Sequence, residues 1–226
     1  MKRYLVGLAL ACSMLATTAN ARDGSAYFTL EGGIASFGDI GIDVNQTSDA
    51  MDLTTNAGWE YGGIVGYDFG SFRLEAEGTR KTSEMQQLRG DSNFDTDEVS
   101  AGVQELASVR GNIESEAIMA NALVDIGGND GVGAYGGVGI GYAWVRTDGS
   151  IDGVIAPFVD DSDNGFAWQL VAGVAASVTE GVELGARYRY FNVGGVEMTS
   201  PGGRNYKSTY GSHSLVATLT FNFGSY

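Results

Sequence analysis

"FRLEAEGTRK", which runs from Phe72 to Lys81, is the stretch that decides the fold. Successive side chains of a β-strand point to opposite faces, so a period of two predicts a strand with two unlike faces. One face of this predicted strand is apolar and the other is charged, and the fold depends on which of them points inward. Apolar and charged residues alternate one by one: Phe72, Arg73, Leu74, Glu75, Ala76 and Glu77.

Seven further stretches alternate in the same way: 25–34, 58–69, 118–126, 131–144, 166–178, 182–190 and 214–223. The links between the eight stretches are short and long in strict alternation. The short links are 68–71, 127–131 and 179–181, and the long ones are 38–56, 83–113, 146–165 and 195–211. Tight turns on one rim and long loops on the other are typical of a barrel that crosses a bilayer. We therefore predict an all-β fold, an eight-stranded antiparallel up-and-down transmembrane β-barrel.

The glycine-rich stretch "GVGAYGGVGIGYAW", residues 131–144, contains the spacing Gly131-x-Gly133-x-x-Gly136 of a dinucleotide-binding loop. That function requires a helix directly after the glycines. Here the alternation continues instead to an aromatic end at Trp144, so we interpret the stretch as a strand. Its glycines leave one strand face almost bare, and we expect this face to make space for arginine side chains inside the barrel.

The N-terminal segment has the pattern of a cleaved secretory signal peptide. A basic start at Lys2 and Arg3 is followed by a mostly apolar run and by a small-x-small cleavage site that ends at Ala21. We therefore expect a signal peptide, residues 1–21, and a single outer membrane β-barrel domain, residues 22–226.

Composition restricts the classes of partner. Cys12 allows the interpretation of the protein as a lipoprotein, but cleavage before it would leave an apolar core of the signal peptide shorter than the usual ~7–15 residues.

Beyond residue 21 the chain has 28 acidic and 11 basic residues, a net charge of −17. Such a surface repels nucleic acid, so we expect no nucleic-acid partner. After the signal, no run approaches the ~18 apolar residues that a spanning helix requires.

The polar faces of the predicted strands carry charges that a barrel would enclose. In a membrane barrel the apolar face meets lipid and the polar face fills the lumen. An eight-stranded barrel is narrow enough for side chains to fill it, and buried charges persist only when they are paired. The alternative is a small gated or low-conductance porin-like channel, because ionisable groups within a membrane are functional by default. We predict a lumen charge network that blocks a pore: Glu31, Glu60, Arg73, Glu75, Glu77, Arg187 and Arg189.

Aromatic residues cluster near the strand ends on the apolar faces. Such residues form belts at the two membrane–water interfaces, where an amphipathic ring meets both lipid and headgroups. We predict an aromatic girdle made of Trp59, Tyr61, Tyr67, Phe69, Tyr142, Trp144, Phe166, Trp168, Tyr188, Tyr190, Phe221 and Phe223.

Residues suited to catalysis are sparse. His213 is the single histidine, and its neighbours Ser212 and Ser214 fall on the opposite strand face. A hydrolase needs a base, a nucleophile and an orienting group within reach of one another, so an outer membrane lipid A hydrolase is the less favoured function. We predict that the protein is not an enzyme and that it has no catalytic residue, no cofactor and no bound structural metal.

The long links are strongly acidic, with 16 acidic and 5 basic residues. We expect an acidic external rim, at which divalent cations bridge to the phosphates of lipopolysaccharide. Asp160, Asp161 and Asp163 form a possible weak cation site, although the bidentate acid of a calcium loop is absent. Helical spacing within residues 97–109 predicts a short helix in the second long link.

The ordered set of strands resembles the eight-stranded outer membrane β-barrel family, the group related to the transmembrane part of outer membrane protein A and to the opacity surface proteins. The likeness is carried by AYFTLEGG, FRLEAEGTRK, IMANALVDI, GAYGGVGIGYAW, WQLVAGVAASV, LGARYRYF and HSLVATLTFNF. It implies a Gram-negative outer membrane protein among lipids and lipopolysaccharide, inserted by the barrel assembly machinery. It also implies a structural or surface-exposed role in envelope integrity, adhesion or interaction through acidic extracellular loops.

Overall fold

The computed structural model describes residues 24–37, 40–44, 47–90, 107–127, 132–151, 157–199 and 205–223. The predicted signal peptide, residues 1–21, lies outside these ranges, as do most of the predicted helix in 97–109 and the last three residues of the chain. Residues 107–109, at the end of that helical prediction, are in a strand instead. Among the described residues, no helix is long and apolar enough to cross a membrane.

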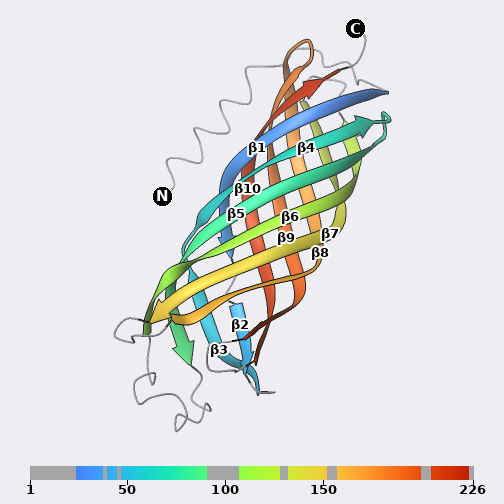
Figure 1. Ribbon diagram of the computed structural model, residues 1–226. Helices are drawn as coiled ribbons and strands as arrows, with labels where there is room; N and C mark the ends of the chain where they lie inside the picture. The colour runs from blue at the N-terminus through green and yellow to red at the C-terminus, as the bar shows by residue number, and fades with distance from the viewer. Residues whose placement is uncertain are drawn as a thin grey trace.

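Eight long strands form a closed antiparallel barrel, as predicted (Figure 1). Each of the eight pairs with the next one around the ring, and β1 closes the ring by pairing with β10 from Tyr27 to Phe37. Closure leaves no unpaired sheet edge, which is the condition for strands to cross hydrocarbon. The strands are β1 Ser25–Phe37, β4 Gly58–Asp68, β5 Phe72–Gly90, β6 Ala107–Gly127, β7 Val132–Ile151, β8 Pro157–Thr179, β9 Val182–Thr199 and β10 Asn205–Asn222.

The first long link, 38–56, is a correction to the sequence prediction, because it forms a β-hairpin rather than a loop. β2 (Ile40–Val44) pairs with β10, and β3 (Thr47–Thr55) pairs with β5. β1 and β4 end before the neighbouring strands β10 and β5 do. Beyond their ends the hairpin takes their place in the barrel wall, at the lower end in Figure 1. Without it, β10 and β5 would expose unpaired backbone groups along their extensions, which is unfavourable for a sheet edge.

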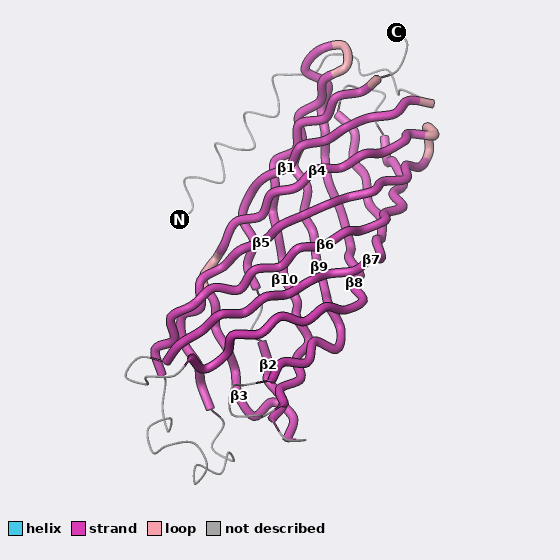
Figure 2. The backbone as a smooth tube through the Cα atoms, in the orientation of Figure 1, coloured by secondary structure: helices cyan, strands magenta, loops and turns pink. Residues whose placement is uncertain are grey.

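The described parts of the other long links are also strand, as the long continuous strand segments in Figure 2 show. In the link 146–165, for example, Arg146 pairs with Ser162 and Asp148 pairs with Asp160. Antiparallel pairing satisfies backbone groups whether or not the side chains alternate in hydrophobicity. The apolar alternation ends where both faces become polar, and a prediction based on it therefore ended the strands too early.

Two of the short links, 68–71 and 179–181, are described and form tight turns at the opposite rim. In the turn from β4 to β5 the Phe69 nitrogen donates to the Phe72 oxygen at 2.9 Å, and the Gly70 nitrogen donates to Asp68 Oδ1 at 2.7 Å. Gly70 and Gly181 have φ values of 96° and 88°, in the left-handed region that favours glycine. The chain can therefore reverse within a few residues at this rim.

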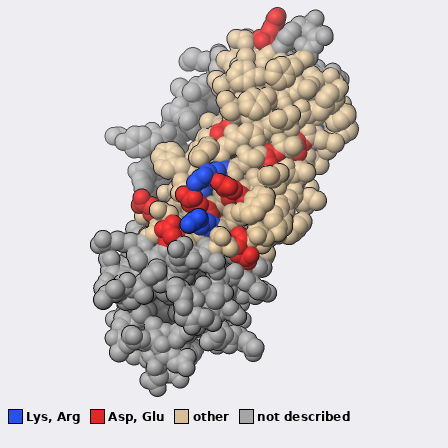
Figure 3. All heavy atoms as spheres, viewed as in Figure 1, with Lys and Arg blue, Asp and Glu red and all other residues tan. Residues whose placement is uncertain are grey.

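The two faces of the wall differ as the alternation predicted. Apolar residues such as Leu74 and Leu184 point outward and are exposed, whereas Glu75 and Arg187 point inward and are buried. On the side shown in Figure 3, most of the surface is neither acidic nor basic, and the charged side chains gather mainly in one patch. A soluble sandwich would bury the apolar face, so the exposed apolar band marks the surface that contacts lipid.

Candidate functional site: the lumen charge network

β5 and β9 stand on opposite sides of the barrel and direct charged side chains toward each other. Arg187 is 2% exposed. It makes two parallel hydrogen bonds to Glu75, from Nη2 to Oε1 at 2.8 Å and from Nη1 to Oε2 at 3.2 Å. Its Nε donates to the Tyr135 hydroxyl at 3.0 Å. The planar guanidinium fork thus links β9, β5 and β7 through one side chain.

Arg189 is fully buried one layer further along β9 and gathers three carboxylates. Its Nη2 lies 2.6 Å from Glu31 Oε1 and 3.0 Å from Glu77 Oε1, and its Nη1 pairs with Glu60. These carboxylates come from β1, β5 and β4. One arginine therefore connects four strands across the lumen.

Neutral side chains complete the network. Asn121 on β6 donates to Glu77 at 2.8 Å and to Glu75 at 3.2 Å, and Gln169 on β8 donates to Glu77 at 3.1 Å. Tyr27 on β1 donates its hydroxyl proton to Glu75 at 2.8 Å. Buried carboxylates need several hydrogen bonds to offset their lost hydration, and these donors supply them.

Lys81 is a member that the sequence prediction missed. Its Nζ lies 3.6 Å from Glu60 Oε2, donates to Ser212 Oγ at 3.1 Å and sits 3.9 Å from the centre of the Phe191 ring. The signal was present in the opening stretch, because Lys81 has the same strand parity as Glu75. The prediction stopped at Glu77 and did not extend the alternation to the end of the stretch.

Arg73 also points inward, and its partner is an aspartate of β6. Its Nε donates to Asp125 Oδ2 at 2.9 Å, nearer the rim of short turns. Its guanidinium also lies 4.5 Å from the centre of the ring of Tyr135, the residue whose hydroxyl accepts the Arg187 hydrogen bond. Arg73 therefore reaches the central network through an aromatic neighbour, while each of the four predicted glutamates forms an ion pair with at least one of Arg187 and Arg189.

The bare face of β7 serves a different purpose from the one expected. A Cβ added to Gly139 would lie 2.1 Å from Asn121 Oδ1 and 2.9 Å from Gln169 Cγ. The glycine therefore makes space for the amide side chains of the two flanking strands, β6 and β8, rather than for arginine stems. The reason is geometric, because the nearest neighbours of a strand face are the same-face residues of the adjacent strands.

The predicted girdle residues lie on the outside of the barrel in two groups. One group is near the short turns, where the Tyr67 and Phe69 rings are 4.7 Å apart. The other is nearer the long strand extensions, where the Tyr142 and Trp144 rings are 5.4 Å apart. Tyr190 and Phe221 are half-buried, and the other predicted members are exposed: Trp59, Tyr61, Tyr67, Phe69, Tyr142, Trp144, Phe166, Trp168, Tyr188 and Phe223.

His213 points outward, and its Nδ1 is 2.7 Å from the Tyr188 hydroxyl. The side chains of Ser212 and Ser214 are buried on the opposite face. The geometry therefore does not bring the histidine and either serine together as a base and a nucleophile.

The predicted weak cation site falls on β8 rather than in a loop, which corrects the loop assignment of Asp160, Asp161 and Asp163. Among the described residues, no group of three or more histidine, cysteine or acidic side chains is placed to hold a metal ion.

Comparisons with known proteins agree with this architecture. The family model described as "Outer membrane protein beta-barrel domain" matches residues 7–223. No curated protein matches the chain. The crystal structure of Neisserial surface protein A is similar, with 18% identity, 88% of this chain and 97% of that chain covered, and a TM-score of 0.52. The outer membrane protein OprG from Pseudomonas aeruginosa gives 12% identity, 91% and 99% coverage, and a TM-score of 0.56. At these identities the two structures show the fold.

Proposed function

This chain belongs to the outer membrane protein β-barrel family, and from that premise we propose that it is a non-conducting barrel with a structural and surface-presenting role. Membership in the family places it in the Gram-negative outer membrane, among lipids and lipopolysaccharide. The role within that membrane is our inference. The proposed role depends on two features of the barrel, a closed lumen and a polar external rim.

The observation that carries the proposal is the lumen charge network. Arg187 and Arg189 extend from β9 and bond to carboxylates on β1, β4 and β5. An ion in transit would have to separate these buried pairs, and separating a desolvated pair is costly. The network therefore supports a barrel that stays closed and rigid rather than one that conducts.

Single-channel recording in planar lipid bilayers tests this proposal. We expect no stable openings from the folded wild-type barrel. The double variant Glu75→Ala with Arg187→Ala removes both partners of one lumen pair, and we expect it to show openings. Stable wild-type openings that change when Arg187 alone is replaced would instead favour a small channel.

The strand extensions support a role in interaction at the cell surface. Beyond the second aromatic group the wall continues through β2, β3 and the long ends of β5 to β10. This part of the chain is acidic in sequence. We propose that it contacts partners outside the cell and that divalent cations link it to lipopolysaccharide phosphates. A chelator should then lower the melting temperature of the barrel in lipopolysaccharide-containing membranes, and an unchanged temperature would contradict the cation link.

We also propose insertion by the barrel assembly machinery. The family assignment supports it. Depletion of that machinery should leave the protein unfolded and sensitive to protease in the periplasm. Folded protein at a normal level after depletion would contradict the proposal.

A further inference from the structure

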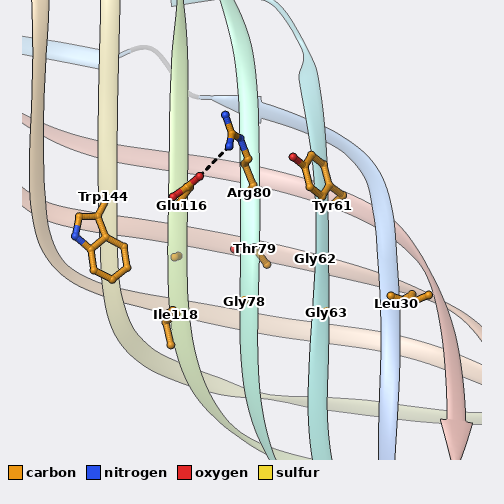
Figure 4. A pocket seen from close by; sticks show the side chains of 11 residues that line it. Leu30, Tyr61, Gly62, Gly63, Gly78, Thr79, Arg80, Glu116, Ile118 and Trp144 are labelled. Atoms are coloured by element: carbon orange, nitrogen blue, oxygen red, sulfur yellow. Dashed lines mark hydrogen bonds and ion pairs between the residues drawn. The ribbon is translucent and has the colours of Figure 1, made fainter.

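A groove lies on the outside of the barrel, across β1, β4, β5 and β6. One row of paired residues forms its floor and sides, in the order Leu30, Gly63, Gly78 and Ile118. The two glycines are direct cross-strand partners, so the wall has no side chain between the leucine and the isoleucine. The groove holds about 500 Å³, which is within the ~300–1,000 Å³ of small-molecule sites. Figure 4 shows the larger side chains around the glycine floor.

Neither glycine is required by the fold. Gly63 and Gly78 both lie outside the positive-φ region. A Cβ added to Gly78 would meet no described atom within 4 Å, and one added to Gly63 would meet the Phe28 ring at 3.7 Å, an ordinary contact. Glycine weakens a strand, and within strands it often marks a place where a ligand approaches the backbone closely. The free space is therefore a feature of the outer surface and not a consequence of internal packing.

The upper row of the groove combines aromatic and charged side chains. Tyr61, Arg80, Glu116 and Trp144 are successive cross-strand partners one row nearer the strand extensions. Tyr61 and Trp144 belong to the aromatic group expected at headgroup level. An outward-facing charge is tolerated near that interface and strongly disfavoured at the middle of the bilayer. The groove therefore begins at the headgroups and extends into the apolar band.

Arg80 can bind an anion at this level. Its side chain is 41% exposed and forms ion pairs with Glu114 at 2.8 Å and Glu116 at 2.9 Å. The dashed line in Figure 4 marks the pair with Glu116. Exposed ion pairs are weak and rearrange easily. A guanidinium has five N–H donors and matches a phosphate group well, so a phosphate can share it with the carboxylates.

We propose that the groove binds one acyl chain of lipid A and that Arg80 contacts a lipid A phosphate. The rim with the strand extensions corresponds to the external rim of an outer membrane barrel, so the groove opens to the outer leaflet, where lipopolysaccharide is present. The apolar floor accommodates a chain, and the basic group stands where the phosphorylated headgroup begins. This inference depends on the membrane placement and not on whether the lumen conducts.

Native mass spectrometry of the full-length folded barrel, first delipidated in detergent, tests the site with lipid A as the probe. We expect one lipid A to bind to the wild type. Gly78→Leu should fill the groove and weaken this binding at least tenfold. The matched control is Gly194→Leu, a second exposed strand glycine at which an added Cβ meets no described atom within 4 Å. Equal loss in both variants, or none in either, would overturn the proposal.

The phosphate contact is tested separately with Arg80→Gln and with lipid A whose phosphates have been removed. Arg80→Gln should weaken binding of intact lipid A severalfold and leave binding of the dephosphorylated form unchanged. An equal effect on both forms would overturn the assigned contact. Gly63→Leu fills the groove from β4 and repeats the test if Gly78→Leu does not fold. If the wild-type barrel forms a dimer, and Gly78→Leu disrupts that dimer without altering lipid A binding, the groove is a contact between two copies of the chain. That result would reject the lipid proposal.

Discussion

Arg80 and Lys81 are consecutive basic residues on β5, and they occupy opposite environments. Lys81 points into the lumen, is almost fully buried and contacts Glu60, Ser212 and the Phe191 ring. Arg80 points outward and has exposed ion pairs with two glutamates of β6. The chemistry of the pairs is similar, but only the inner one is desolvated. The comparison shows that strand parity, rather than residue type, decides whether a charge stabilises the barrel core or is available to a ligand.

The largest expected difference between the inner and outer faces of the barrel wall is the difference between replacing Arg189 and replacing Arg80. Arg189→Met would leave three buried carboxylates without their shared cation, because Glu31, Glu60 and Glu77 all pair with it. We expect the free energy of unfolding to fall by about 3–5 kcal/mol. Urea unfolding in lipid vesicles, followed by tryptophan fluorescence, measures it.

The control for that prediction is Arg80→Met, which removes an exposed cation from the same barrel. Its unfolding curve should overlay the wild-type curve within error, because water and salt screen exposed pairs. Equal destabilisation by the two substitutions would contradict the assignment of inner and outer faces.

Lys81→Met should have a smaller effect than Arg189→Met. The methionine retains most of the packing against Phe191, and Glu60 keeps its pair with Arg189. The loss of one buried partner should lower the free energy of unfolding by about 1–3 kcal/mol. The temperature at which the folded band disappears in a heat-shift gel gives a second measure. An unaltered temperature would indicate that Lys81 is dispensable to the network.

The smallest single effect is expected at a glycine of the outer face, and a glycine of the inner face provides its comparison. Gly139→Ala places a methyl group against Asn121 and Gln169, and overpacking of this kind costs about 1–3 kcal/mol. Gly78→Ala meets open space and should stabilise the strand by about 0.5–1 kcal/mol, because alanine restricts the unfolded chain more than glycine does. Urea midpoints that shift in opposite directions would support the comparison. A loss of stability in both variants would contradict it.

The strand extensions show where prediction from sequence ended. Residues 146–150 and 160–164 are all polar or glycine, so hydrophobicity shows no period of two there although the backbone pairs as in the membrane part. The hairpin of β2 and β3 was missed for another reason, because the alternation in Ile40–Val44 is only five residues long. Hydrophobic alternation marks the part of a strand that contacts lipid. Backbone pairing does not depend on lipid, so a strand can continue beyond the end of the alternation.

The amino-acid sequence by itself determined the eight crossing strands, the rim of short turns and the inward face of Glu75, Glu77 and Arg187, because each follows from a period of two along a local stretch. Tertiary structure alone decided which carboxylates share Arg189, why Gly139 must lack a side chain, and that Gly63 and Gly78 meet across two strands. These features depend on the register between strands. Register is set by closure of the whole barrel, and no single strand contains it.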